Sequence, residues 1–333
     1  MDKFPFYTGQ PREACSEKPA AIPVLERSRQ AEARAYIAEQ GLVDAVNVML
    51  ILGQPLLLTG EPGTGKTQLA YSVGCELGFN VLKFETKSTS AARDLFYTYD
   101  TLGRFHAAQL KTGSLDSKEY ITYNALGLAI LLSRDRSAVE EWAPESFEHT
   151  GPLRSIVLID EIDKAPRDFP NDLLNEIENL YFKAPELGIG DKSVGTDQNM
   201  RPIIIITSNS EKNLPDAFLR RCVYYNIPFP GKEQLREIVL SHLPVFKGKD
   251  NQWIGEAIEF FLKLRGPNWG LDKRPATAEL LNWLTYLRER GIESSKRLRA
   301  QSDLVGASLT ILFKSADDQE KAQQILSEWL KEP

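Results

Sequence analysis

Short apolar runs alternate with longer amphipathic stretches over the first two thirds of the chain. Five runs have the length and composition of strands: residues 55–59, 80–85, 155–161, 202–209 and 223–227. The stretches between them favour helices: residues 31–52, 66–77, 91–100, 102–109, 124–133, 171–181 and 214–221. Strands that alternate with helices predict an α/β fold, with a five-stranded, mostly parallel sheet covered by helices on both faces.

The last third of the chain has a helical pattern throughout. Helices are predicted over residues 232–243, 251–264, 277–290 and 303–330, with a break near Ser315. Pro228, Pro230 and Gly231 interrupt the pattern, so we place a domain boundary at about residue 230. We therefore predict an irregular arm over residues 1–25, an α/β core over 26–230 and a small all-α domain over 231–333. The glycine-rich residues 184–199 fit a hairpin.

The stretch GEPGTGKT, residues 60–67, joins the first predicted strand to the following helix. Its glycines allow positive φ angles, so that successive N–H groups can surround one anion at the start of a helix. Lys66 can reach the phosphates of ATP, and the hydroxyl of Thr67 can bind Mg²⁺. The predicted contacts to ATP in this loop are Gly60, Glu61, Pro62, Gly63, Thr64, Gly65, Lys66, Thr67 and Gln68.

Two other predicted strands end in polar groups that nucleotide hydrolysis uses. Asp160 and Glu161 end the third strand, and Asn209 ends the fourth. Parallel sheets of this class bind ligands beyond the carboxyl ends of their strands. We assign Asp160 to Mg²⁺, because a hard cation prefers carboxylate and water oxygens. Glu161 is assigned to orienting or deprotonating the attacking water, and Asn209 to hydrogen bonds with that water and the terminal phosphate.

Composition and net charge limit the possible binding partners and the expected cellular compartment of the protein. A net charge of −6 argues against a protein that binds nucleic acid over its whole surface. Three scattered cysteines suit a reducing cytoplasm without a disulfide framework. The chain shows no secretory signal and no apolar run of membrane-spanning length. We therefore expect a cytoplasmic protein.

In its motifs the chain resembles the AAA+ ATPases, and within them it is most similar to the MoxR group. The resemblance covers about residues 30–330 and is carried by GEPGTGKT, VLIDEIDKAP (157–166), TSNSEKNLPDAFLRRC (207–222) and DKRPATAELLNWL (272–284). It implies a P-loop NTPase core with a helical lid, assembled into a hexameric ring with ATP between neighbouring subunits. The phosphate-loop, Walker B and first-sensor positions fall on the residues assigned above.

The resemblance also implies roles for basic residues near the ends of these motifs. Arg221 matches the arginine finger that reaches into the next subunit, and Arg220 is the alternative, although the family more often has an acid there. Arg274 matches the second sensor, but Leu280 and Leu281 lie one residue off the usual register, so Lys273 stays an alternative. Residues 86–100 occupy a pore-facing region without the usual motif, which leaves the residues that contact substrate unassigned.

Three functions are weighed. The leading one is an ATPase that remodels or matures partner proteins, which the resemblance pairs with a von Willebrand factor A domain protein. A second is a DNA-associated loader or helicase-like ATPase, for which the sequence has no recognition-helix or aromatic–basic signature. A third is a nucleotide-gated signalling or defence switch with little turnover, against which Glu161 and Arg221 both argue.

Overall fold

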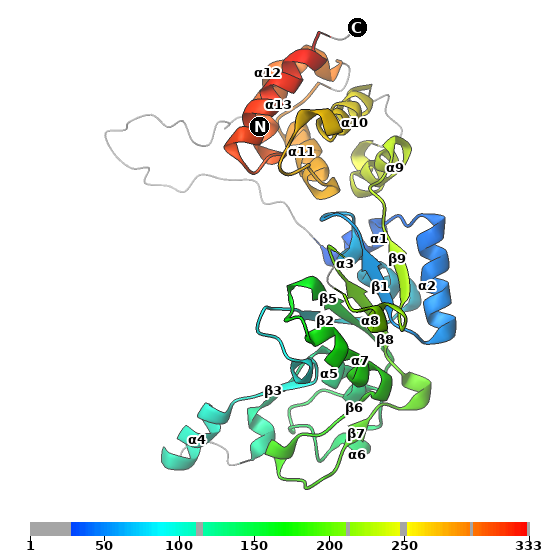
Figure 1. Cartoon of the computed structure of the whole chain (residues 1–333), viewed down its shortest axis with the longest axis vertical. Helices are drawn as coiled ribbons and strands as arrows, with labels where there is room; N and C mark the ends of the chain where they lie inside the picture. Colours follow the sequence, from blue (N-terminus) through cyan, green and yellow to red (C-terminus); the bar gives the residue numbers. More distant parts are fainter. Residues whose placement is uncertain (1–27, 111–115, 211–213, 247–251, 294–295, 332–333) are drawn as a thin grey trace. The chain divides into compact units, whose positions relative to one another are not determined.

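The computed structural model describes residues 28–110, 116–210, 214–246, 252–293 and 296–331 (Figure 1). The arm predicted over residues 1–25 lies outside the described residues. The chain forms two compact units, one of residues 38–229 and the other of the described residues in 1–37 and 230–333. Residues 28–37, which we assigned to the α/β core, thus group with the C-terminal helices.

The first unit is built on a five-stranded sheet in the order β2-β5-β8-β1-β9, and every neighbouring pair is parallel. Its strands are β1 (Leu56–Thr59), β2 (Asn80–Glu85), β5 (Ser155–Asp160), β8 (Ile203–Thr207) and β9 (Val223–Asn226). The strands β1, β5 and β8 are buried along their whole length, because sheet neighbours flank them and helices cover both faces. The predicted α/β sheet is confirmed.

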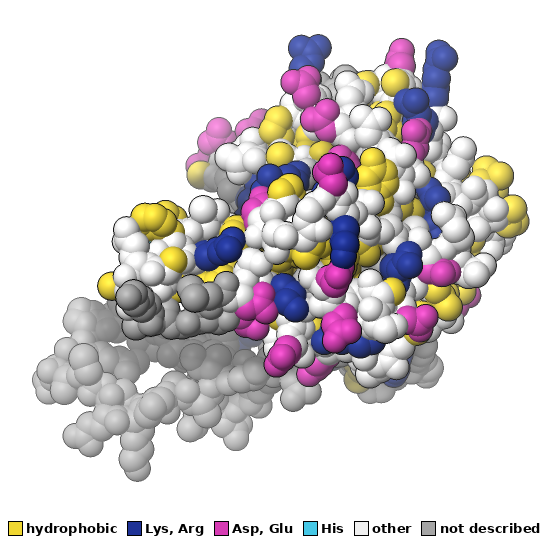
Figure 2. Space-filling view, turned by 90° about the horizontal axis from the view of Figure 1, so that it is seen from below, with side chains coloured by type: hydrophobic (Ala, Val, Ile, Leu, Met, Phe, Trp, Pro, Cys, Tyr) yellow, Lys and Arg dark blue, Asp and Glu magenta, His cyan; other side chains and the backbone are white. Residues whose placement is uncertain are grey.

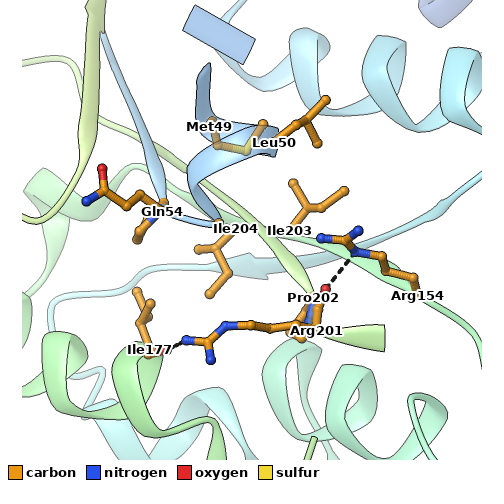
Figure 3. A pocket seen from close by; sticks show the side chains of 11 residues that line it. Met49, Leu50, Gln54, Arg154, Ile177, Arg201, Pro202, Ile203 and Ile204 are labelled. Carbon is orange, nitrogen blue, oxygen red and sulfur yellow. Dashed lines mark hydrogen bonds between the residues drawn. The ribbon is translucent and has the colours of Figure 1, made fainter. Parts of the chain in front are cut away.

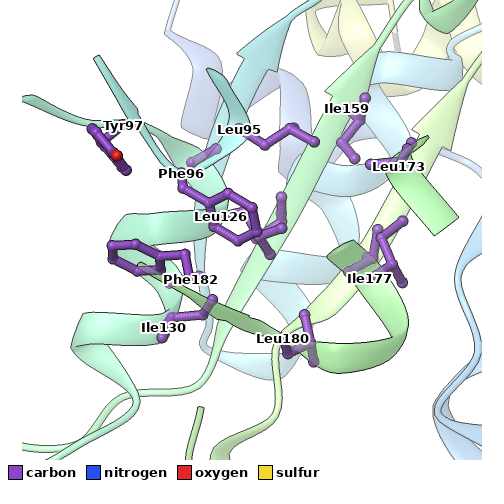
Figure 4. Close-up of a cluster of buried hydrophobic side chains, with 14 of the residues drawn as sticks. Leu95, Phe96, Tyr97, Leu126, Ile130, Ile159, Leu173, Ile177, Leu180 and Phe182 are labelled. Atoms are coloured by element: carbon purple, nitrogen blue, oxygen red, sulfur yellow. The ribbon is translucent and has the colours of Figure 1, made fainter. Parts of the chain in front are cut away.

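Helices cover the two faces of this sheet. Helix α3 (Lys66–Leu77) packs on one face, where Gly74 approaches Ile156. Helices α5 (Ala125–Leu132) and α7 (Phe169–Asn179) lie over the other face, in one core with Val157 and Ile159 (Figure 4). Side chains that alternate along β5 therefore serve two separate layers.

The helix predicted over residues 31–52 is instead two helices, α1 (Arg29–Ala35) and α2 (Gln40–Leu52). The backbone is extended at Tyr36 and at Glu39, which interrupts the helical hydrogen bonds. The Glu39 carboxylate accepts a hydrogen bond of 2.6 Å from the hydroxyl of Tyr225 on β9. The periodicity of neighbouring residues cannot predict a contact with a residue this distant in sequence.

The helix predicted over residues 91–100 is also wrong. A 3₁₀ turn, η1 (Ala92–Leu95), is followed by β3 (Tyr97–Tyr99), which pairs antiparallel with β4 (Ile121–Tyr123). Helix α4 (Thr101–Leu110) follows β3 and precedes β4 in the sequence, and none of its residues is buried. It exposes Leu102, Phe105 and Leu110.

The remaining parts of the first unit are short. The helix expected over 171–181 ends at Asn179 and leads into a small hairpin of β6 (Tyr181–Phe182) and β7 (Val194–Gly195). Helix α6 (Arg136–Val139) and helix α8 (Asp216–Leu219) are single turns. The Phe182 ring stacks on the Phe96 ring, with centroids 5.2 Å apart, which joins the β6–β7 hairpin to the chain before β3 in the core of the unit (Figure 4).

The second unit is helical among its described residues. Its longer helices are α9 (Lys232–His242), α10 (Gln252–Leu264), α11 (Thr277–Glu289), α12 (Ser302–Ser308) and α13 (Ala316–Trp329). Trp253, Trp283 and Trp329 are buried between them, whereas Trp269 is partly exposed. Helix α1 joins this unit through a hydrogen bond of 2.8 Å from the Ser241 hydroxyl to the Ala35 carbonyl.

Among the described helices, none is by itself long and apolar enough to cross a membrane. Helices α1 and α2 satisfy the length and composition criteria only when the two are taken together.

Candidate functional site

The glycine-rich loop follows β1 and leads directly into α3. Gly60, Gly63 and Gly65 have φ angles of 140°, 77° and 91°, which L-residues with side chains rarely adopt. A Cβ atom on Gly60 would lie 2.6 Å from the carbonyl oxygen of Ile227. The loop therefore needs glycine at this position both for its backbone conformation and for its close approach to the chain after β9.

Lys66, the first residue of α3, folds back over the loop. Its Nζ donates hydrogen bonds to the carbonyl oxygens of Gly60 and Glu61, at 2.8 and 2.9 Å. The residue is buried, and this burial lowers the pKa of Lys66 below its usual value, against the raising effect of Asp163, Asp160 and Glu161. The ammonium thus lies inside the loop, surrounded by acids from the neighbouring strand end.

Asp160 at the end of β5 is tied to the loop. Its Oδ1 accepts a hydrogen bond of 2.7 Å from the hydroxyl of Thr67 and another of 2.7 Å from the hydroxyl of Thr207 on β8. Burial would raise the pKa of Asp160, but hydrogen bonds from Thr207, Lys83 and Thr67 together lower it. This carboxylate is therefore held in its charged form, at the point where β5, β8 and α3 meet.

Glu161 has a left-handed backbone, with φ 56° and ψ 53°, which is uncommon for a residue with a side chain. Its N–H donates to the Thr207 hydroxyl at 2.9 Å. Its carboxylate forms an ion pair with Lys164 and lies 3.5 Å from the Asn209 side-chain nitrogen. The turn thus points Glu161 away from Asp160 and toward Asn209, as expected for two consecutive acids with different tasks.

Three residues at this site were missed by the sequence analysis. Lys83 on β2 forms an ion pair with Asp160, at 2.9 Å between Nζ and Oδ2. Thr207 bridges Asp160 and the backbone of Glu161, and Asp163 accepts a hydrogen bond of 3.0 Å from the N–H of Asn209. Thr207 and Asp163 lie within the quoted motifs and could have been noticed, whereas Lys83 needed the strand order.

Two arginines follow α8, and the contacts of Arg221 are with residues outside the cluster around Asp160. Arg221 pairs with Glu178 on α7, at 2.7 Å, and also donates to the carbonyl oxygen of Ala217. Both Arg220 and Arg221 are exposed. Their position on the surface leaves them accessible to another molecule, as a residue acting on a neighbouring subunit must be.

Lys273 and Arg274 belong to the second unit, and both are exposed. The buried carboxylate of Asp318 accepts hydrogen bonds from the N–H groups of Asp272 and Lys273, at 2.9 and 3.2 Å. The backbone before Arg274 is therefore fixed from α13, while the role of Arg274 as second sensor stays a prediction.

A small cavity and a groove in the first unit lie away from the glycine-rich loop. A cavity of about 20 Å³ at the amino ends of β1 and β8 is lined by Met49, Arg154 and Arg201, and is about the size needed for one water molecule (Figure 3). Arg154 and Arg201 are already engaged there with backbone carbonyl oxygens. A groove of about 290 Å³ lies between η1, α7 and β6. Neither is at the glycine-rich loop.

The residues at the loop fit a magnesium-bound nucleotide. Mg²⁺ usually takes one or two protein oxygens and completes its octahedron with phosphate oxygens and water. Thr67 offers one hydroxyl oxygen, and the charged carboxylate of Asp160 lies 2.7 Å from it. Gly60, Gly63 and Gly65 supply the backbone geometry that exposes N–H groups to phosphate.

Comparison with characterised proteins gives distant relatives. CD-NTase-associated protein 6 of Pseudomonas aeruginosa is 23% identical over 56% of this chain and 52% of its own length. Lon protease of Metamycoplasma arthritidis (strain 158L3-1) is 24% identical over 85% of this chain and 28% of its own length. The chain thus spans about half of the first relative and little more than a quarter of the second.

Among solved structures, the RuvB Holliday junction branch migration motor of Thermotoga maritima matches with a TM-score of 0.44 and 16% identity, over 84% of this chain and 70% of that one. A mutant form of the same RuvB matches with a TM-score of 0.46 and 17% identity, over 84% and 69%. Residues 56–229 match the model of the family described as "ATPase family associated with various cellular activities (AAA)". This span contains the glycine-rich loop and the strand ends that meet around it, and the chain belongs to the AAA ATPase family.

Proposed function

We propose that the site formed by the glycine-rich loop, β5 and β8 binds and hydrolyses Mg-ATP. The observation that carries the proposal is the hydrogen bond of 2.7 Å between Thr67 and Asp160. It joins the first residues of α3 to the end of β5, over 93 residues of sequence. A phosphate loop and a strand-end carboxylate in direct contact are the arrangement that P-loop phosphoryl transfer requires.

Each side chain has a separate task in this proposal. Lys66 exchanges its two carbonyl acceptors in the loop for phosphate oxygens. Thr67 and Asp160, joined by their hydrogen bond, would hold the magnesium ion. The magnesium ion supplies charge neutralisation on the phosphates. Glu161 takes up the proton of the attacking water, and Asn209 orients that water between Glu161 and the phosphate.

Hydrolysis drives the remodelling or maturation of partner proteins in the MoxR-like manner, within a ring of subunits and together with a von Willebrand factor A domain partner. The exposed arginines after α8 support a site shared between subunits. The face seen in Figure 2 carries acidic and basic side chains interspersed, and not the basic stripe that a DNA-tracking surface needs. Net charge of −6 supports a protein client in the same way.

ATP turnover by the wild type and by Glu161→Gln tests the proposal. Loss of the base is expected to lower turnover at least about 100-fold, because the attacking water keeps its proton. Binding of a fluorescent ATP analogue is expected to persist, since Lys66 and Thr67 are unchanged. Equal turnover in the two proteins would remove Glu161 from the mechanism.

Duplex and single-stranded DNA in the same assay separate the candidate functions. We expect turnover to be unaffected by either. A large stimulation that disappears as salt is raised would instead favour a DNA-associated ATPase.

A further inference from the structure

Lys83 on β2 contacts the carboxylate that the proposed function assigns to the magnesium ion. Its Nζ lies 2.9 Å from Oδ2 of Asp160 and 2.7 Å from Oε1 of Glu85. The parallel register of β2 and β5 explains both contacts. Glu85 lies opposite Asp160, and Lys83 lies two residues earlier on the same face of β2. The side chains of Asp160 and Lys83 are 10% and 26% exposed, so the pair lies largely out of water.

The two oxygens of the Asp160 carboxylate are held by different kinds of group. Oδ1 accepts from the neutral hydroxyls of Thr67 and Thr207, and Oδ2 faces the ammonium of Lys83. The two hydroxyls fix the orientation of the carboxylate without Lys83. What Lys83 adds is therefore mainly a positive charge, which offsets the charge of Asp160 and repels a divalent cation bound at Thr67.

We propose that Lys83, through its positive charge beside Asp160, lowers the affinity of this site for the magnesium ion of Mg-ATP. The inference rests on the proposed function of the same site. A weaker hold on the cation favours release of magnesium with the product, a step that limits turnover in many enzymes. A purely structural role, as a link between β2 and β5, would affect stability and leave the magnesium dependence unchanged.

The test is a Mg²⁺ titration of the binding of a fluorescent ATP analogue to the full chain, with thermal unfolding measured in parallel. Lys83→Met is expected to lower the half-saturating Mg²⁺ concentration about 3- to 10-fold, because one repelling charge is removed near the cation. The matched control is Lys118→Met. Lys118 is also 26% exposed and lies near an acid, Asp116, but it belongs to η2 (Ser117–Tyr120) and donates a hydrogen bond to the carbonyl oxygen of Glu140, after α6. Its half-saturating concentration is expected to stay within about twofold of the wild type.

A second variant keeps the test decisive if Lys83→Met does not fold. Glu85 is exposed, and Glu85→Gln removes one negative charge beside Lys83 while keeping a side-chain oxygen that can accept its hydrogen bond. It is expected to raise the half-saturating concentration about twofold. An unchanged or higher value for Lys83→Met, or an unchanged or lower one for Glu85→Gln, would overturn the inference. A wild type that binds no nucleotide at any Mg²⁺ concentration would overturn the proposed function itself.

Discussion

At the scale of single residues, a few buried carboxylates fix the backbone around them. Asp160 joins three elements of the first unit through Thr67 and Thr207, and in the second unit Asp318 on α13 holds the N–H groups of Asp272 and Lys273. Burial would raise the pKa of Asp318, but these hydrogen bonds and one with Ser315 lower it. The charged form is therefore favoured by folding.

Asp318→Asn is expected to destabilise the second unit by about 2 kcal/mol, because an amide is a weaker acceptor for two backbone N–H groups and brings a donor into a buried place. Since folding lowers this pKa, the stabilisation is fully present above the unfolded pKa of about 4 and is lost as pH falls through the lower folded value. Denaturant unfolding at pH 7 and in acid measures both effects.

The neighbouring Asp317 is exposed and provides the matched control. Asp317→Asn is expected to change stability by less than about 0.5 kcal/mol. A similar loss in both variants at pH 7 would show that the hydrogen bonds of Asp318 are not the cause.

At the scale of elements, the backbone of α5 packs closely against the backbone at Phe96, and this contact fixes the position of the helix. Gly127 on this helix lies so near β3 and its preceding turn that an added Cβ atom would be 2.0 Å from the carbonyl oxygen of Phe96. Phe96 also accepts a hydrogen bond from the N–H of Asn124, at 2.9 Å, just before the helix begins. The helix and the chain before β3 therefore share an interface of backbone atoms, which cannot move independently.

Gly127→Ala is expected to lower the free energy of unfolding by about 3 kcal/mol, because the clash is with backbone and not with a flexible side chain. Gly255 on α10 has no atom within 4 Å of an added Cβ atom. Gly255→Ala is therefore expected to raise stability by about 0.5–1 kcal/mol through helix propensity. Denaturant unfolding of both variants measures the difference, and a shift of the same sign would contradict this account of α5.

At the scale of the whole molecule, we propose that a second chain completes the site. The cluster around Asp160 contains Lys66 and Lys83, while Arg221 is paired with Glu178 on the surface. If Arg221 acts as the proposed arginine finger, it must leave this exposed ion pair on assembly, which costs little because such pairs contribute about 1 kcal/mol or less.

Mixing two inactive variants tests this arrangement. Arg221→Ala and Glu161→Gln are each expected to have almost no ATP turnover alone. An equal mixture should recover about a quarter of the wild-type rate, because one interface in four combines an intact Glu161 with a neighbour's intact Arg221. Arg220→Ala in place of Arg221→Ala distinguishes the two arginines. A mixture without activity, or a protein that stays monomeric with ATP, would contradict a shared site.

Much of the fold and of the site could be predicted from local sequence. Apolar runs bounded by turn residues identified the five strands, and positive-φ glycines identified the loop that begins α3. Asp160, Glu161 and Asn209 could be placed near that loop because the carboxyl ends of parallel strands meet at one edge. The predicted helices were wrong where residues distant in sequence determine the backbone conformation. This happened at Glu39, which contacts Tyr225, and in the pairing of β3 with β4.

The sequence by itself determined the five strands of the central sheet, the glycine-rich turn proposed to hold phosphate and the acids that end the strands, because these depend on neighbours within a few positions. Only the tertiary structure decided that β2 lies beside β5, and hence that Lys83 faces Asp160. It also decided that residues 28–37 group with the C-terminal helices. Strand order and packing depend on the burial of whole faces against one another, and no local pattern encodes which faces meet.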